Sequence, residues 1–213
     1  MKFGGRQKVF SALSLYATMV TKATTKQAVR REISERLKRL TSEEKQTQSK
    51  IVFEKLLNLP SFQKSKRVST YLSIDNEIDT EPIVRKIFET GKECFVPRYS
   101  KAGMEMVKIH SYQDWETLPV TSWGIKQPGL KEQREDALKT GGLDFVVVPG
   151  VGFTAKGHRL GHGGGYYDRY MADLRKNQDV PPALVGLAFK EQICDDLPVT
   201  ELDVQIDLVL FPE

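Results

Sequence analysis

The run 143-LDFVVVP-149 decides the fold class of this chain. Its apolar side chains follow one another without the alternation of a half-buried strand, and this is the pattern of a strand that is buried on both faces. The runs 183-ALVGLAF-189 and 206-IDLVLF-211 have the same character. Strands of this kind belong to parallel sheets that helices cover, so the sequence predicts an α/β protein.

Helical patterns alternate with these strands. Apolar residues recur at helical spacing over residues 26–40, and 41-TSEE-44 has the form of a capping box that opens a second helix through about residue 59. The next predicted elements are a strand over 66–73, a helix over 79–91 and a strand over 93–97. Because β-α-β crossovers are right-handed, we expect a layered α/β/α sandwich around a mostly parallel sheet, Rossmann-like and in a single domain.

Length and composition exclude several classes of protein. The 213 residues suit one domain with a sizeable core. No apolar run approaches the roughly 20 residues of a membrane-spanning helix, so we expect no membrane partner. The two cysteines are too few for a disulfide framework or a thiolate zinc site.

The charge of the chain is unevenly distributed. The net charge is +4, but seven of the 32 basic residues lie in residues 1–31 together with no acid. The remainder therefore has 25 basic and 28 acidic residues, which argues against a nucleic-acid-binding surface spread over the fold.

The leading segment is treated apart from the fold. Residues 1–22 are basic, hydroxylated and apolar without acids, which is the composition of an organelle transit peptide. The alternative is an N-terminal extension that carries no address. We expect the folded domain to cover residues 23–213, in the cytoplasm or, if the segment directs import, in the mitochondrion.

A glycine-rich stretch, 157-GHRLGHGGGYYDRY-170, follows the strand at 143–149. Ligands of open α/β sheets bind outside the carboxyl ends of the strands, so this stretch is the first candidate for a site. A P-loop is excluded because no Gly-Lys-Ser/Thr triplet occurs. The stretch 150-GVGFTA-155 matches a dinucleotide fingerprint, but a helical pattern follows where its second strand and acid belong, so we interpret the match as accidental.

The glycines instead predict a phosphate cradle. Glycine lets the backbone approach a ligand closely, and a following helix offers free N–H groups and partial positive charge. Arg159 adds a fork suited to phosphate oxygens. Asp168, in the first turn of the helix, could hold Mg²⁺ or merely complement the helix dipole. Lys26 and Arg30 are an i, i+4 pair that could reach over the same site or form a solvated face.

Together these residues amount to a family resemblance. The chain is similar to 5-formyltetrahydrofolate cyclo-ligases, also called methenyltetrahydrofolate synthetases, from about residue 24 to residue 211. The segments that carry the resemblance are Lys26 with Arg30, 72-LSIDNEIDT-80, 97-PRY-99, 104-MEMVKI-109, 121-TSWGIKQP-128, 149-PGVGFTAKGHRLGHGGGYYDRY-170 and 188-AFKEQI-193.

The resemblance implies an ATP- and Mg²⁺-dependent conversion of 5-formyltetrahydrofolate to 5,10-methenyltetrahydrofolate. The γ-phosphoryl group of ATP moves to the formyl oxygen, the folate N10 attacks the formyl carbon, and phosphate departs. Positioning and charge stabilisation are then the main tasks of the protein. We expect a monomer in folate one-carbon metabolism that accepts the substrate and its polyglutamates.

The resemblance also assigns site residues. It implies Arg159 and Tyr166 as catalytic, and Asp168 and Asp203 as the Mg²⁺ ligands. The ATP-binding residues that it implies are Lys26, Gln27, Ala28, Val29, Arg30, Arg159, Leu160, Gly161, His162, Gly163, Gly164, Gly165, Tyr166 and Tyr167. The folate-binding residues that it implies are Leu72, Glu77, His162, Gly163, Gly164, Gly165 and Tyr166.

Two loop positions depart from the family pattern, and two side chains have open roles. Animal members tend to carry basic residues where this chain has His162 and Gly164. Met106 and Trp123 are as suited to the core as to the pterin. The alternatives to the enzyme are a non-catalytic folate- or nucleotide-binding protein and an NAD(P) oxidoreductase that uses residues 150–155. Two carboxylates placed for Mg²⁺ favour the enzyme, because a mere folate binder needs no metal.

Overall fold

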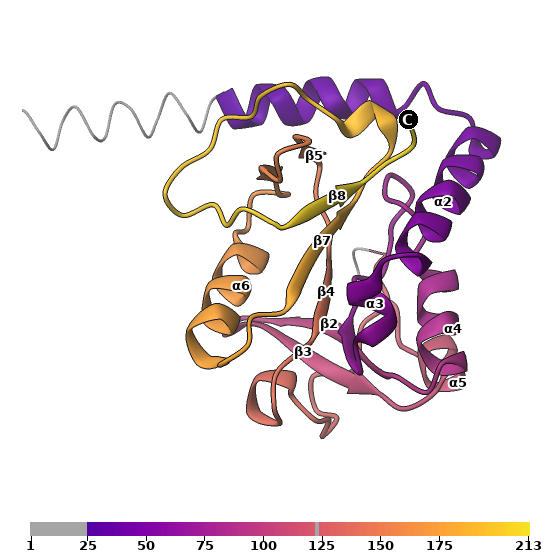
Figure 1. The fold of residues 1–213 in the computed structure, drawn as a ribbon, viewed down its shortest axis with the longest axis vertical. Helices are drawn as coiled ribbons and strands as arrows, with labels where there is room; N and C mark the ends of the chain where they lie inside the picture. Colours follow the sequence, from indigo (N-terminus) through magenta and orange to yellow (C-terminus); the bar gives the residue numbers. More distant parts are fainter. Residues whose placement is uncertain (1–24, 122–123) are drawn as a thin grey trace, which may run out of the picture.

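A computed structural model describes residues 25–121 and 124–213 as a sheet of six strands with helices on both faces (Figure 1). A first helix occupies residues 25–37. The elements that follow are α2 (Ser42–Leu57), α3 (Pro60–Lys64), β1 (Arg67–Ser69), α4 (Glu81–Glu89), β2 (Glu93–Ser100), β3 (Gly103–Ile109), α5 (Tyr112–Glu116), η1 (Ala137–Lys139), β4 (Phe145–Val148), β5 (Gly152–Phe153), β6 (Arg159–Leu160), α6 (Tyr166–Asn177), β7 (Ala183–Leu187), η2 (Lys190–Gln192) and β8 (Leu208–Leu210).

The strand order of the sheet is β3-β2-β1-β4-β7-β8, and every neighbouring pair is parallel except β2 with β3. From the centre, β1 leads through α4 to β2 on one side, and β4 leads through α6 to β7 on the other. The chain therefore changes direction between β1 and β4, where a ligand crevice forms outside the carboxyl ends of the strands. Figure 1 shows α6 on one side of the sheet and α3 and α4 on the other. The predicted fold class is confirmed.

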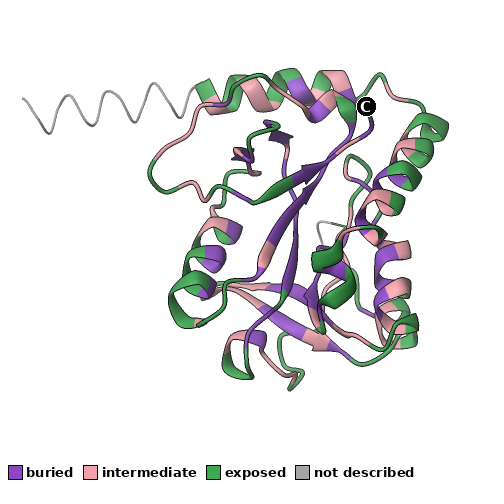
Figure 2. Ribbon diagram, in the orientation of Figure 1, coloured by how far each residue is buried: buried purple, intermediate pink, exposed green. Residues whose placement is uncertain are grey.

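The core lies between the strands and the inward faces of the helices (Figure 2). All four residues of β4 are fully buried, as the uninterrupted apolar run predicted. Phe62 of α3 packs edge-on against Phe145 of β4, with ring centroids 5.4 Å apart. None of the helices in the described ranges is long and apolar enough to cross a membrane.

Some predicted boundaries differ from the structure. The capping box at Thr41 and Glu44 is present, but α2 ends at Leu57, and Pro60 begins the short helix α3 instead of only ending α2. Proline fits there because an N–H at the first helical position would have no acceptor within the helix, so the missing N–H of proline costs no hydrogen bond. The strand predicted over 66–73 is limited to Arg67–Ser69, and β3, the antiparallel edge strand, was not predicted as a strand.

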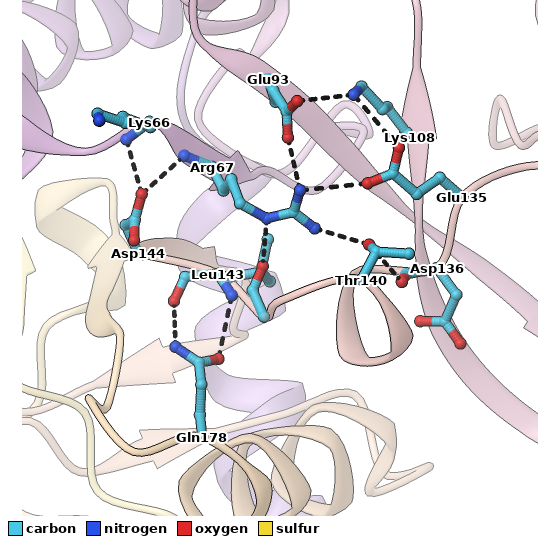
Figure 3. Close-up of polar contacts among 11 residues, drawn as sticks. Lys66, Arg67, Glu93, Lys108, Glu135, Asp136, Thr140, Leu143, Asp144 and Gln178 are labelled. Carbon is cyan, nitrogen blue, oxygen red and sulfur yellow. Dashed lines mark hydrogen bonds and ion pairs between the residues drawn. The ribbon is translucent and has the colours of Figure 1, made fainter.

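A polar network lies at the amino-terminal ends of the central strands (Figure 3). Arg67 contacts Glu93 at 2.6 Å and Glu135 at 3.2 Å, and its Nε donates to the Gly142 carbonyl. The Asp144 carboxylate accepts from the backbone N–H groups of Lys66 and Arg67. These contacts tie the starts of β1, β2 and β4 together, at the end of the sheet opposite the glycine-rich stretch.

Candidate active site

The first helix brings two cations to the glycine-rich stretch. Its buried residues Ile33 and Leu37 pack into the core. A Cβ on Gly152 would lie 2.5 Å from Ile33 Cδ1, so the absence of a side chain there lets the helix sit against the β5–β6 hairpin. Arg30 Nε then donates to the Gly161 carbonyl at 2.8 Å. Burial lowers the Arg30 guanidinium pKa, against the opposing effect of Asp203.

Glycines set the path of the loop between β6 and α6. Gly163 and Gly165 have φ angles of 112° and 65°, in the region that favours glycine. Gly165 is the N-cap of α6 and offers no side chain to its N–H groups. Arg169, one turn into α6, donates to the Gly164 carbonyl at 3.0 Å. The loop therefore leads into an uncapped helix start, an arrangement that favours an anion.

Arg159 is buried beneath this loop. Its side chain is only 3% exposed, its Nη2 lies 2.7 Å from Asp168 Oδ2, and its Nη1 donates to the Pro149 carbonyl. A Cβ on Gly161 would lie 2.7 Å from Arg159 Nη1, so the guanidinium needs a glycine there. Its buried Nε has no hydrogen-bond partner within the described part of the chain. An unpaired donor next to a cavity is open to a ligand acceptor.

The two predicted metal ligands are joined by one turn, although 35 positions separate them in the sequence. Asp203 lies in the turn before β8 and pairs with Lys26, while Val204, the next residue, donates its N–H to Asp168 Oδ1 at 3.1 Å. Burial acts to raise the Asp203 pKa, but bonds from Lys26 and Thr200 outweigh it, so the pKa is lowered.

A mainly apolar cavity of about 240 Å³ lies beside the loop. Its walls come from the segments after β1 and β4, from the end of β2, and from the start of α6. They are formed by Tyr71, Leu72, Ile74, Glu77, Pro97, Tyr99, Ile125, Pro149, Arg159, Gly161, His162, Gly164, Gly165, Tyr166, Tyr167 and Asp168. The cavity occupies the crevice that the strand order predicts, and its aromatic lining suits a flat ring system.

Tyrosines dominate the wall of the cavity. Tyr99 and Tyr166 meet edge to face, with ring centroids 5.3 Å apart. Burial raises the pKa of the Tyr71, Tyr99 and Tyr167 phenols, and the nearby Glu77 carboxylate raises each further. These phenols are therefore neutral hydrogen-bond donors at physiological pH. Tyr71 donates to the Ile78 carbonyl, and the Tyr167 hydroxyl is buried beside Tyr99.

Glu77 places a carboxylate at the rim of this cavity. Its side chain is 9% exposed, and it accepts from the backbone N–H of Ile74 and contacts His162. A shielded carboxylate next to an aromatic pocket can accept from paired N–H groups on a ring edge.

Comparison with known proteins identifies the family of this chain. A profile of the 5-formyltetrahydrofolate cyclo-ligase family matches residues 22–212. The chain belongs to the 5-formyltetrahydrofolate cyclo-ligase family. The predicted resemblance is confirmed, and as a member of this family the chain is an enzyme.

Relatives and solved structures agree with this assignment. The cyclo-ligase is 44% identical to the mouse 5-formyltetrahydrofolate cyclo-ligase over 91% of its own length and 97% of the mouse chain. It is 41% identical to a probable 5-formyltetrahydrofolate cyclo-ligase of Caenorhabditis elegans, over 82% of its length and 86% of that chain. An NMR structure of the 5,10-methenyltetrahydrofolate synthetase of Aquifex aeolicus superposes with a TM-score of 0.68 and 31% identity, covering 89% of the cyclo-ligase and 88% of that chain.

The structure brings most of the predicted site residues of the cyclo-ligase together. Leu72, Glu77 and residues 161–166, except Gly163, line the cavity, and Lys26 and Arg30 contact Asp203 and Gly161 beside it. In the first helix, Gln27 and Ala28 are exposed, while Val29 is partly buried and packs against the core. Leu160 is buried.

The sequence left open whether Met106 and Trp123 belong to the core or contact the pterin. Met106 is fully buried in the core, which removes it as a ring-binding candidate. Trp123 lies outside the described residues. Sequence reasoning named no role for Tyr71, Tyr99 or Ile125, which line the cavity. Their only signal was membership of the segments 66–73, 97-PRY-99 and 121-TSWGIKQP-128, because no pattern distinguishes a cavity tyrosine from a core tyrosine.

Proposed function

We propose that this enzyme converts 5-formyltetrahydrofolate to 5,10-methenyltetrahydrofolate, with ATP converted to ADP and phosphate. The observation that carries the proposal is that one loop borders both the aromatic cavity and the start of α6. Residues 161–165, apart from Gly163, line the aromatic cavity, and the same segment leads into the uncapped start of α6. A folate ring in the cavity and a triphosphate at the helix start would thus meet at this loop, with Arg159 beneath it.

The reaction needs an activated formyl group. An N-formyl carbon is a poor electrophile because the nitrogen donates electrons to it, and its oxygen would have to leave as an oxide equivalent. Transfer of the γ-phosphoryl group to that oxygen forms the O–P bond and breaks the bond to ADP. N10 then attacks the carbon and loses its proton, and the C–O bond breaks to release phosphate. Each step balances without an oxidant or reductant.

The residues at the loop supply charge and position. Arg159, with an unpartnered Nε, stabilises the negative charge that develops on the transferring group and on the departing phosphate. Glu77 binds the polar edge of the pterin, and Leu72 and Tyr166 pack against its ring. The backbone of residues 161–165, with Lys26, Arg30, Leu160 and Tyr167, binds the phosphates.

The carboxylates of Asp168 and Asp203 fit Mg²⁺. Both are hard oxygen donors, and Mg²⁺ is commonly held by one or two carboxylates together with substrate phosphates. Among the described residues no group of three or more His, Cys, Asp and Glu side chains could hold a metal, so phosphates and water would have to complete the coordination. When bound there, Mg²⁺ would neutralise phosphate charge.

The experiment that tests this function is a turnover assay. Purified protein is mixed with 5-formyltetrahydrofolate and either Mg·ATP, Mg·ADP, or ATP with EDTA, and the absorbance of methenyltetrahydrofolate is followed. Product with Mg·ATP alone is the expected result. Folate or nucleotide binding without an ATP-dependent product signal would support the non-catalytic binding protein instead.

We further propose that the enzyme is a monomer of one domain over residues 23–213, accepts polyglutamated folate, and acts in the cytosol without nucleic-acid or membrane partners. The acid-free residues 1–22, which lie outside the described residues, support mitochondrial import as the alternative. A reporter fused to residues 1–25 tests it, since diffuse cytosolic fluorescence would count against import. Analytical ultracentrifugation tests whether the enzyme is a monomer.

A further inference from the structure

Two of the proposed phosphate ligands and the two proposed metal ligands contact one another in the structure. Lys26 Nζ contacts both oxygens of Asp203, at 2.7 and 2.5 Å, and Arg159 Nη2 contacts Asp168 Oδ2 at 2.7 Å. All four side chains are largely shielded, with exposed fractions between 3% and 18%. Of the cations proposed to meet the phosphates, Lys26 and Arg159 each have a carboxylate as their partner, whereas Arg30 donates to the Gly161 carbonyl.

The two carboxylates are held in the same way. Asp203 Oδ2 accepts from the Thr200 backbone N–H at 2.6 Å and from its hydroxyl at 2.8 Å, and Asp168 Oδ1 accepts from the Val204 N–H. Asp168 Oδ2 faces Arg159, and both oxygens of Asp203 face Lys26. The 200–204 turn therefore holds one oxygen of each carboxylate, and each carboxylate loses one partner when its cation leaves.

We propose that Asp168 and Asp203 are the counter-ions of Arg159 and Lys26 before nucleotide binds and exchange them for Mg²⁺ when Mg·ATP binds, with Thr200 positioning Asp203 for this exchange. The inference rests on the proposed function and adds which groups neutralise these four side chains before and after Mg·ATP binds. The two cations would then contact the phosphates, and the two carboxylates that they leave would be free to hold the metal.

The exchange makes metal and nucleotide binding interdependent. ATP without Mg²⁺ meets cations that are already paired and two carboxylates that repel it. Mg²⁺ without ATP meets carboxylates that are already neutralised. Coupling between two ligands is reciprocal and commonly changes affinity by about 5- to 150-fold. Each ligand should therefore raise the affinity for the other by a factor in that range.

Isothermal titration calorimetry of ATP, in EDTA and in Mg²⁺, tests the exchange. Asp203→Asn keeps an oxygen that can accept from Thr200 but removes the charge that holds Lys26. It should bind ATP about fivefold more tightly than wild type in EDTA and about tenfold more weakly in Mg²⁺. Glu201→Gln is the matched control, because it removes one charge from an exposed position in the same turn. Its affinities should stay within about twofold of wild type in both buffers.

Two further variants separate the exchange from a loss of folding. Lys26→Met frees Asp203 and should bind Mg²⁺ alone about fivefold more tightly than wild type. Thr200→Val removes the hydroxyl bond to Asp203 and should weaken ATP binding in Mg²⁺ about fivefold, a loss of one hydrogen bond to a charged group, whereas Thr200→Ser should match wild type. Thermal unfolding of each variant confirms that it is folded.

The results distinguish the two proposals. If wild-type protein does not bind ATP in the presence of Mg²⁺, the proposed function is wrong. If wild type binds but Asp203→Asn changes both affinities in the same direction, or Lys26→Met gains no affinity for Mg²⁺, the exchange is wrong while the function stands. If Thr200→Val and Thr200→Ser behave alike, Thr200 does not position Asp203.

Discussion

The imidazole Nε2 of His162 lies 3.2 Å from Glu77 Oε1, and this contact joins the glycine loop after β6 to the segment after β1. The two partners differ in exposure: the Glu77 side chain is 9% exposed, and that of His162 is 56% exposed. Glu77 therefore belongs to the cavity wall, whereas His162 covers it from the solvent side. A ligand that uses the Glu77 carboxylate must share it with His162.

Glu77→Gln should raise the KM for 5-formyltetrahydrofolate about tenfold, because a hydrogen bond to a charged group contributes about 1.5–3 kcal/mol. The KM for ATP should stay near that of wild type. Steady-state kinetics with each substrate varied in turn checks both values. An unchanged folate KM would remove Glu77 from the binding site.

His162→Ala should have a smaller effect, at most about fivefold on the folate KM, because a contact made by an exposed polar side chain contributes about 0–1 kcal/mol and His162 is 56% exposed. The same assay measures it. A loss as large as that of Glu77→Gln would show that His162 itself contacts the substrate.

Arg159→Ala should reduce kcat by about 10²–10³-fold, the cost of removing one preorganised charge-stabilising group. The variant should also unfold at a lower temperature, since Asp168 would lose its partner in a shielded site. Arg159→Lys is the control that retains charge without the planar fork. Wild-type kcat and ATP KM in the alanine variant would exclude a role for Arg159.

Gly161→Ala and Gly164→Ala should change different kinetic parameters. A Cβ at Gly161 would meet Arg159 Nη1 at 2.7 Å, whereas a Cβ at Gly164 would meet the Tyr166 ring at 2.8 Å. The first change should therefore lower kcat about tenfold or more, as expected when a group that stabilises charge is displaced. The second should mainly raise the folate KM. Equal effects of both variants on both parameters would contradict this separation.

Asp114→Asn should destabilise the fold in a pH-dependent way. Hydrogen bonds from Arg134, at 2.7 and 2.8 Å, are the main cause of the lowered Asp114 pKa. A lowered folded-state pKa stabilises above the unfolded value of about 3.9 and stops doing so as the pH falls through the folded value. Urea unfolding should show a loss of about 1–2 kcal/mol at pH 7. The difference should shrink as the pH falls below about 3.9, and a constant difference would contradict a stabilising ion pair.

The sequence was sufficient for the parallel part of the sheet. Strands buried on both faces, such as β4, cannot be mistaken for amphipathic elements, and capping signals at Thr41 and Glu44 mark a helix start directly. The edge strand β3 was not predicted, because four of its seven residues are only partly buried and its pairing with β2 is antiparallel. Such a strand is defined by its partner more than by its own pattern.

The charged part of the candidate site was also readable from the sequence, because several glycines directly before a helix, with an arginine beside them, are typical of an anion site. The pairing within it was not. Lys26 and Asp203 are 177 positions apart and meet only because the first helix packs on the hairpin. The tyrosine lining of the cavity was likewise invisible, since it is assembled from the segments after several strands.

The Arg67 network at the amino-terminal edge of the sheet has a consequence for how this enzyme can change. The charged residues that tie the strand starts together lie at one end of the sheet, and those proposed to meet the ligands lie at the other (Figures 1 and 3). Substitutions at Arg67, Glu93 or Glu135 can therefore adjust thermal tolerance while ligand affinity is retained, and loop substitutions can adjust affinity while thermal tolerance is retained. The two properties can be optimised independently, by selection or by an engineer.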